Sequence, residues 1–224
     1  MPDRTARGEN AADATGGRRP LASRSTAWAG ALAAFLARAG VAPNAISAAS
    51  VVFALAAAAG ILLAPGAEGW AARSLWIGGA AGIQLRLLCN LMDGMVAVEG
   101  GRKSACGDLW NEIPDRIADA AVLLAAGVAA GFAWLGVAAA IGAVLTAYLR
   151  AFGAALTGLH DFRGPMAKPH RMATLTAACL AAAVLPCAGP AILAVATGVI
   201  VAGIVVTCWR RTALLAERLR ERQS

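Results

Sequence analysis

The sequence predicts an all-α integral membrane protein with six transmembrane helices and an N-terminal helix in the membrane interface. Of the 224 residues, 59% are hydrophobic and the mean hydropathy is +0.64, which is too apolar for a soluble domain. The apolar runs are long enough to cross a hydrocarbon layer of about 30 Å as helices. Alanine and glycine recur in all of these runs, and such small residues let helices pack closely in a bilayer.

The N-terminal part has two different patterns. Residues 1–23 mix arginine, aspartate, glycine and proline without apolar periodicity, which predicts a disordered cytoplasmic tail. Over residues 25–39, Trp28, Leu32 and Leu36 recur at helical spacing. This pattern favours a short amphipathic helix in the membrane interface, and packing of the same helix against the bundle is a compatible alternative.

Six apolar segments follow, and together they predict one membrane domain over residues 24–210. Pro43 precedes the first span, as expected for a proline at a helix start, and Pro65 ends it. Pro114 lies inside the third span, where it should loosen the first turns. The expected spans are 44–63, 71–98, 107–130, 132–157, 171–187 and 190–210. Residues 211–224 are expected to form a charged, amphipathic cytoplasmic extension.

The distribution of lysine and arginine predicts the orientation. The N-terminal tail, the 99–106 connection, the 158–171 loop and the C-terminus hold nearly all of them, whereas the connections on the other side hold only Arg73. Both termini are therefore expected in the cytoplasm, in a multi-pass protein of the cytoplasmic (inner) membrane. The net charge of +7 suits anionic lipid headgroups. We expect no nucleic-acid partner, because no basic or aromatic module for reading nucleic acid accompanies this charge.

The most informative stretch covers residues 90–119. Six acidic side chains lie there in an otherwise apolar chain: Asp93, Glu99, Asp108, Glu112, Asp115 and Asp119. An ionised side chain at membrane depth costs about 2.5 to 3.5 kcal/mol on insertion scales, so we expect a compensating ligand, namely a metal ion. On a helix, the four carboxylates from residue 108 onward fall within roughly 60°, with Asn111 at the edge of this stripe. Arg86, Asn90 and Asp93 share a face of the preceding helix, and the two polar stripes should face each other rather than lipid.

The spacing of this stretch resembles the signature of the CDP-alcohol phosphatidyltransferase family, D-x2-D-G-x2-A-R-x8-G-x3-D-x3-D. Every gap between the motif positions matches, and the identical positions are Asp93, Gly94, Ala97, Gly107 and Asp115. Three positions differ. Asn90 and Asn111 stand where the first and third aspartates belong, and Val98 replaces the arginine. The segment 43–47, Pro-Asn-Ala-Ile-Ser, is also similar to the P-N-x-I/L-T sequence that precedes the first membrane helix in this family.

The resemblance implies an enzyme of phospholipid biosynthesis. Such a transferase moves a phosphatidyl group from a CDP-linked lipid donor, commonly CDP-diacylglycerol, to an alcohol acceptor and releases CMP. This displacement needs divalent cations that bridge the pyrophosphate and a carboxylate that takes the proton of the acceptor. By position, Asp93 would bind the metal, and Asp115 would be both a metal ligand and the general base. The expected cofactor is Mg²⁺ or Mn²⁺, since both accept oxygen ligands.

The two asparagines change the expected metal site. Asn90 and Asn111 can still offer amide oxygens, but two formal negative charges are lost relative to the motif. Glu112 and Asp119 lie on the same helical stripe and could restore part of this charge. Arg86 lies deeper on the same face as Asp93, and we expect it to pair with Asp119 or another carboxylate of the stripe.

Further residues are expected to bind the substrates. The resemblance implies that small residues let the donor nucleotide and pyrophosphate lie against the helices, although close helix packing predicts the same residues. These are Gly94, Ala97 and Gly107. Basic residues in and before the 158–171 loop would clamp a phosphorylated acceptor, and the positive-inside bias is the alternative explanation for them. These are Arg150, Arg163, Lys168 and Arg171.

Two other classes of function compete with the transferase. A catalytically degenerate relative would use the same site to bind a lipid or a nucleotide, and the three departures from the motif are its support. A small transporter would show internal repeats and broken helices in matching halves, and the sequence contains neither. The acceptor alcohol, the number of metal ions and the oligomeric state, a homodimer included, stay open.

Overall fold

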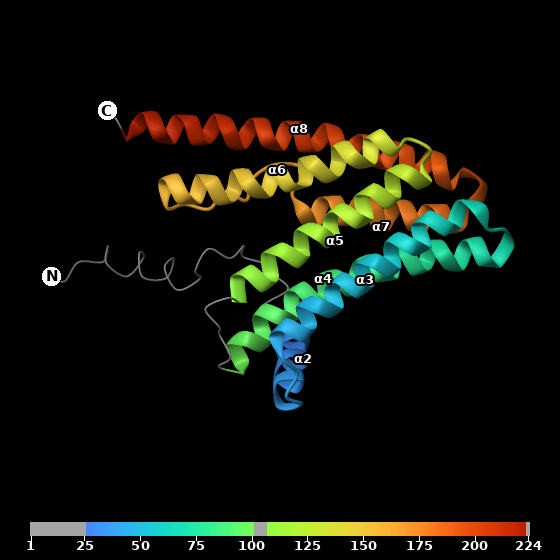
Figure 1. The fold of residues 1–224 in the computed structure, drawn as a ribbon, viewed down its shortest axis with the longest axis horizontal. Coiled ribbons are helices and arrows are strands. Elements are labelled where there is room, and N and C mark those ends of the chain that lie inside the picture. Colours follow the sequence, from blue (N-terminus) through green and yellow to red (C-terminus); the bar gives the residue numbers. More distant parts are fainter. Residues whose placement is uncertain (1–25, 101–106, 223–224) are drawn as a thin grey trace.

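The computed structural model describes residues 26–100 and 107–222, and this part of the chain is helical without strands (Figure 1). The all-α class is therefore confirmed. The helices are α2 (Ala27–Arg38), α3 (Pro43–Leu63), α4 (Gly69–Glu99), α5 (Gly107–Ala129), α6 (Ala133–Thr157), α7 (Lys168–Val184) and α8 (Gly189–Glu221). Two short 3-10 turns, η2 (Ala64–Gly66) and η3 (Pro186–Ala188), follow α3 and α7. The tail expected over residues 1–23 lies outside the described residues.

Four helices are long and apolar enough to cross a membrane, namely those over Pro43–Gly66, Gly69–Glu99, Ala133–Thr157 and Pro186–Glu221. They mark a membrane-embedded protein. The other two expected spans correspond to α5 and α7, which are not among these four helices. The helix α5 carries the acidic stripe, and α7 has only 17 residues. The count of six spans and the interfacial position of α2 therefore stay predictions.

Pro114 lies inside α5, which runs from Gly107 to Ala129. Residues 211–221, expected as a charged C-terminal extension, continue α8 as one helix to Glu221. The side chain of Arg222 donates to the backbone carbonyls of Leu156 (2.9 Å) and Thr157 (2.5 Å). It thereby satisfies carbonyl groups at the end of α6, where a helix has no partners of its own for them, and ties this end to α8.

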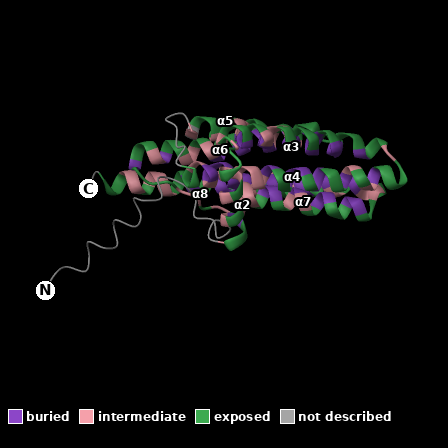
Figure 2. Cartoon of the chain, turned by 90° about the horizontal axis from the view of Figure 1, so that it is seen from below, coloured by how far each residue is buried: buried purple, intermediate pink, exposed green. Residues whose placement is uncertain are grey.

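The packing of the helices determines which polar faces meet. The helix α3 packs on α4 and α5, α5 packs on α6, and α7 packs on α4 and α8. The short helix α2 lies against α4 near its C-terminal end (Figure 1). Buried residues point into the bundle, whereas exposed residues cover its outer faces (Figure 2). Many of these exposed residues are large and apolar, among them Val52, Ile141 and Val195, as expected for a helix bundle surrounded by lipid.

A close approach between α3 and α4 holds the polar face of α4 in place. A Cβ atom built on Gly82 would come within 2.8 Å of the Cβ of Ala57 and within 2.9 Å of the carbonyl oxygen of Phe53. Only glycine fits this distance between the two helices. Since Gly82 lies one turn before Arg86, this contact fixes the start of the segment that carries the polar residues of α4.

Candidate functional site

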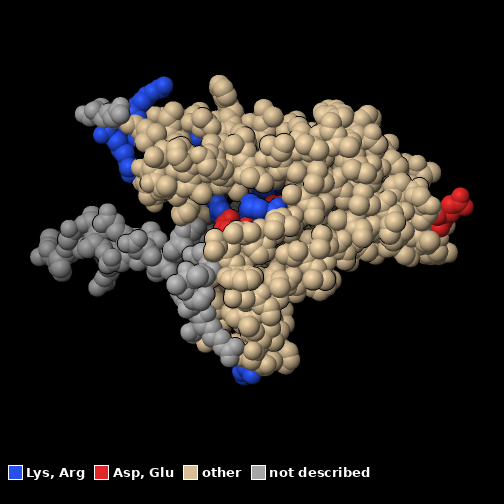
Figure 3. All heavy atoms as spheres, viewed as in Figure 1, with Lys and Arg blue, Asp and Glu red and all other residues tan. Residues whose placement is uncertain are grey.

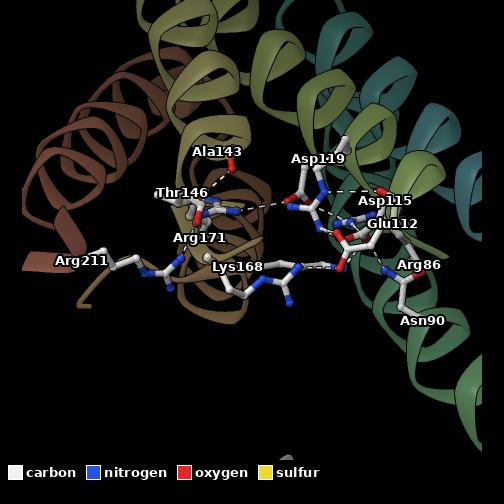
Figure 4. A network of polar contacts seen from close by, with 12 residues as sticks. Arg86, Asn90, Glu112, Asp115, Asp119, Ala143, Thr146, Lys168, Arg171 and Arg211 are labelled. Carbon is white, nitrogen blue, oxygen red and sulfur yellow. Dashed lines mark hydrogen bonds and ion pairs between the residues drawn. The ribbon is translucent and has the colours of Figure 1, made fainter. Parts of the chain in front are cut away.

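A group of charged and amide side chains gathers where α4, α5, α6 and α7 meet, and we call it the polar cluster. Its members are Arg86, Asn90, Asp93, Glu112, Asp115, Arg116, Asp119, Arg150, Lys168 and Arg171. Charged atoms of both signs are visible in a hollow near the middle of a face whose other charged atoms lie at its ends (Figure 3). In the close-up, Asp115 and Asp119 of α5 lie between Arg86 of α4 on one side and Lys168 and Arg171 of α7 on the other (Figure 4). The polar stripes of α4 and α5 thus face each other.

Asp115 lies at the centre of the polar cluster, and its side chain is 7% exposed. Its Oδ1 atom accepts hydrogen bonds from Arg86 Nη2 at 2.6 Å, from Asn90 Nδ2 at 2.5 Å and from Lys168 Nζ. Its Oδ2 atom accepts one from Arg116 Nη2 at 2.5 Å. Three cationic side chains therefore surround this one carboxylate and balance its charge.

Asp119 is more deeply buried than Asp115 and pairs with two buried arginines. Arg86 Nη2 forms an ion pair with its Oδ1 at 2.6 Å, and Arg171 Nη2 donates to its Oδ2 at 3.2 Å. Arg171 also donates to Thr146 Oγ1 at 3.3 Å and to the carbonyl of Met166 at 2.9 Å. The expected pairing of Arg86 with Asp119 is confirmed. Because an unpaired buried charge is very costly, this network holds α4, α5, α6 and α7 in one arrangement.

Asp93 has different surroundings, although it is also buried. Its Oδ2 accepts a hydrogen bond from Ser47 Oγ at 2.9 Å, and its Oδ1 accepts one from the backbone N–H of Gly94 at 2.5 Å. Lys168 and Asp115 lie close enough to act on it electrostatically. Asp93 thus lies beside the ion-paired carboxylates, with neutral donors on its own two oxygens.

Glu112 lies at the edge of the polar cluster, where half of its side chain is exposed. It pairs with Arg150 Nη2 at 2.5 Å and with Arg116 Nη2 at 3.3 Å. The guanidinium of Arg150 also lies 5.6 Å from the centre of the Phe162 ring, a distance that permits a cation–π contact. Glu112 is therefore bound to cations at the rim of the hollow.

The remaining expected site residues are Gly94, Ala97, Gly107, Asn111 and Arg163. Gly94 is buried, whereas Ala97, Gly107 and Asn111 are half-buried. Arg163 is placed differently from the other three basic residues. Its side chain is 64% exposed and pairs with Asp161 of its own loop at 3.2 Å, and within the described part of the chain it forms no ion pair with a carboxylate of α5.

Two members of the site were not among the expected site residues. Arg116 contacts both Asp115 and Glu112, and it follows Asp115 directly in the sequence, so its position inside the acidic stripe was the available signal. Ser47 donates to Asp93 across 46 residues of chain. The only signal for Ser47 was its place in the 43–47 segment, because the sequence alone does not predict that α3 packs on this face of α4.

The donor chemistry of the polar cluster fits a divalent cation that takes few protein ligands. Asp93 would supply a carboxylate, and Asn90, one turn earlier on α4, would supply an amide oxygen. Both are hard oxygen ligands of the kind that Mg²⁺ and Mn²⁺ accept. Among the described residues, no group of three or more His, Cys, Asp or Glu side chains is arranged to hold a metal ion. The remaining coordination positions would therefore be filled by water or by substrate oxygens, as is common for Mg²⁺.

No protein-family model and no curated protein matches the sequence. The fold matches solved structures of the phosphatidylinositol phosphate synthase of Mycobacterium tuberculosis. The structure with CDP-DAG bound has a TM-score of 0.67 and 22% sequence identity, and the match covers 84% of this chain and 92% of that chain. For the complex with manganese and citrate the TM-score is 0.67, with 22% identity and coverage of 84% and 88%. For the apo form it is 0.62, with 22% identity and coverage of 81% and 93%. The chain therefore shares the fold of a CDP-alcohol phosphatidyltransferase over most of its length, as the resemblance of the motif predicted.

Proposed function

We propose that this protein is a transferase of phospholipid biosynthesis, which moves a phosphatidyl group from a CDP-linked lipid, in the first place CDP-diacylglycerol, to an alcohol and releases CMP. One observation carries the proposal. Asn90 and Asp93 of α4 lie next to Asp115 of α5 in a hollow of the bundle, and these are motif positions of a family whose fold the chain shares. The same fold in the M. tuberculosis synthase was solved with CDP-DAG and with manganese.

Residues of α4 would hold the donor in place. Gly94 and Ala97, as small residues on α4, would let the nucleotide and pyrophosphate lie beside Asp93. Asp93 and Asn90 would hold Mg²⁺ or Mn²⁺, which supplies positive charge that orients the pyrophosphate and stabilises the leaving CMP. The cationic groups of Arg116, Arg150 and Lys168 at the hollow would favour the negative charge that develops on the phosphoryl oxygens.

Asp115 would take the proton of the attacking hydroxyl. In the structure three cationic side chains pair with its carboxylate, so a base role requires that a substrate draw at least one of these cations away. Arg86 is fully buried, whereas the side chains of Lys168 and Arg116 are 23% and 24% exposed. Lys168 and Arg116 are therefore the neighbours that can turn toward an acceptor or its phosphate. Movement of either one would leave the Asp115 carboxylate freer to accept the proton when the acceptor is bound.

We also propose that α5 and α7 cross the membrane with the other four long helices. Their ionised side chains pair with each other and with α4, so lipid does not have to solvate them. Six spans would place both termini, the hollow and the basic 158–171 loop on the cytoplasmic side of the inner membrane, as the distribution of lysine and arginine predicts. The helix α2 would then lie in the cytoplasmic interface.

The proposal is tested with the purified full-length protein in detergent. It is incubated with labelled CDP-diacylglycerol, Mn²⁺ or Mg²⁺, and a panel of acceptors that includes glycerol 3-phosphate, inositol phosphate and serine. CMP release that depends on one acceptor supports the transferase. The competing reading is a lipid- or nucleotide-binding relative without activity, and the saturation of Asp115 by three cations favours it. Binding of CDP-diacylglycerol without CMP release under any of these conditions would establish that reading instead.

A further inference from the structure

The two carboxylates at the centre of the site differ in their capacity for a metal ion. A carboxylate oxygen has two lone pairs. Asp115 Oδ1 already accepts from three donors, Arg86, Asn90 and Lys168, and its Oδ2 accepts from Arg116. Each oxygen of Asp93 accepts one hydrogen bond in the described structure, from Ser47 and from Gly94. Both oxygens of Asp93 therefore retain a lone pair for a cation, whereas on Asp115 only Oδ2 retains one, and that oxygen is already ion-paired with Arg116.

The charges of the polar cluster also favour a metal ion at Asp93 over one at Asp115. Its four carboxylates are outnumbered by five cationic side chains. Asn90 and Asn111 lack the negative charge of the aspartates at the corresponding motif positions. The Asp93 carboxylate attracts a dication, because the groups that donate hydrogen bonds to it are neutral. A second dication next to Asp115 would have to approach the cationic ends of Arg86, Arg116 and Lys168, which repel it.

We propose that this site binds one divalent cation per chain, through Asp93 and Asn90, and that the Lys168 ammonium and the Arg86 guanidinium hold Asp115 in place of a second metal ion. Phosphoryl-transfer sites often use two metal ions about 3.5 to 4 Å apart, so this arrangement sets the chain apart from such sites. The inference rests on the proposed function, because it assigns the metal content of that same site.

The test measures Mn²⁺ binding by the purified full-length protein in detergent, by titration calorimetry and by the electron paramagnetic resonance spectrum of bound Mn²⁺. We expect one Mn²⁺ per chain, with the six-line spectrum of an isolated ion. Two Mn²⁺ ions per chain, or a spectrum broadened by spin coupling between two ions, would overturn the proposal. No bound Mn²⁺ at millimolar concentration would overturn it as well.

Variants test whether the named residues determine the number and the affinity of bound Mn²⁺ ions. Asp93→Asn should lose the bound Mn²⁺. The double change Lys168→Met with Asn111→Asp removes a cation and restores a motif carboxylate, so it should admit a second Mn²⁺ with a coupled spectrum. Lys168→Met alone should tighten the first Mn²⁺ by about tenfold, because it removes a nearby positive charge. The matched control Arg163→Met lies outside the cluster and should change neither the stoichiometry nor the affinity. If Lys168→Met and Arg163→Met have the same effect, Lys168 has no special role.

The metal inference and the proposed function can fail separately. One bound Mn²⁺ without CMP release in the substrate assay would retain the metal inference and reject the transferase. CMP release that persists after chelation of all divalent cations would retain the transferase and reject the metal inference.

Discussion

At the scale of single residues, the two buried carboxylates Asp93 and Asp115 have different neighbours. Asp93 is bonded by a hydroxyl and a backbone amide, and its charge remains available to a metal ion. Asp115 is bonded by an amide and three cations, and its charge is already balanced. The first arrangement suits a ligand, and the second suits a base that is released only when a substrate draws off one of its cations.

We predict that Asp93→Asn and Asp115→Asn each reduce CMP release by on the order of 100-fold or more, since one removes a metal ligand and the other the proton acceptor. The measurement is CMP release by purified variants that elute as the wild-type protein does. Glu217→Gln serves as the control, because this exposed carboxylate of α8 lies outside the polar cluster. Wild-type rates for either aspartate variant would remove that residue from the mechanism.

The asparagines and Glu112 give a second prediction at this scale. Asn111→Asp should lower the Mn²⁺ concentration needed for half-maximal activity, because a carboxylate attracts a dication more strongly than an amide does. Glu112→Gln should raise this concentration by a smaller factor, since Glu112 is half exposed and already neutralised by Arg150 and Arg116. Metal titrations of activity compare the three proteins. If neither change shifts the required concentration, neither position contributes to the metal site.

The sequence was sufficient to predict which side chains share a stripe, because spacing along a helix determines the face. It was insufficient to predict their partners. The expectation for Arg86 named Asp119 or another carboxylate, and the structure shows that both Asp119 and Asp115 pair with it. Lys168 and Arg163 lie in one basic loop and have similar sequence contexts, yet only Lys168 reaches Asp115. That difference depends on where α7 begins and how it packs on α4.

At the scale of helices, the apolar runs and their prolines and glycines located every helix of the described structure. The bounds of α7 and α8 differ from the expected ones. The helix α7 was expected from residue 171 and begins at Lys168, because Ala167 is its N-cap and Pro169 lies in its first turn. The helix α8 was expected to end near residue 210 and continues to Glu221, because Arg211 and Arg222 bond to backbone carbonyls of neighbouring segments.

The buried ion network that joins α4, α5 and α7 should contribute strongly to stability. We predict that Arg86→Ala lowers the free energy of unfolding by about 3 to 5 kcal/mol, because it leaves Asp119 buried beside a single remaining cation, Arg171. Arg163→Ala should change it by less than about 0.5 kcal/mol, as expected for an exposed pair. Thermal unfolding in one detergent compares the variants. Equal Tm values for Arg86→Ala and the wild-type protein would contradict the network.

The glycine contact between α3 and α4 gives a prediction that is independent of charge. Gly82→Leu should cost about 1 to 3 kcal/mol of stability, since its Cβ would already overlap Ala57 and the Phe53 carbonyl. Gly198→Leu in α8 is a matched control, because no heavy atom lies within 4 Å of a Cβ built there. The Tm difference between the two leucine variants measures the contact, and the absence of a difference would show that α3 and α4 do not pack at Gly82.

At the scale of the whole molecule, the arrangement of helices and the distribution of charge support one topology. A reporter fused after Ser224 and one inserted near Gly131, in the turn between α5 and α6, should lie on opposite sides of the membrane. If both reporters appear in the cytoplasm, the count of six spans is wrong and α5 does not cross. Arg73 is the only lysine or arginine in the connections expected on the outer side, so charge alone predicts a single orientation.

The central claim is that the side chains in the hollow between α4, α5 and α7 catalyse the transfer of a phosphatidyl group. The most direct measurement follows both products of the reaction, CMP and lipid, by mass spectrometry, with CDP-diacylglycerol, Mn²⁺ and the acceptor panel. We predict that one acceptor yields equal amounts of CMP and of its phosphatidyl ester, and that Asp93→Asn and Asp115→Asn yield neither. A wild-type protein that forms no phosphatidyl ester with any acceptor, or that releases CMP only together with phosphatidic acid, would contradict the account.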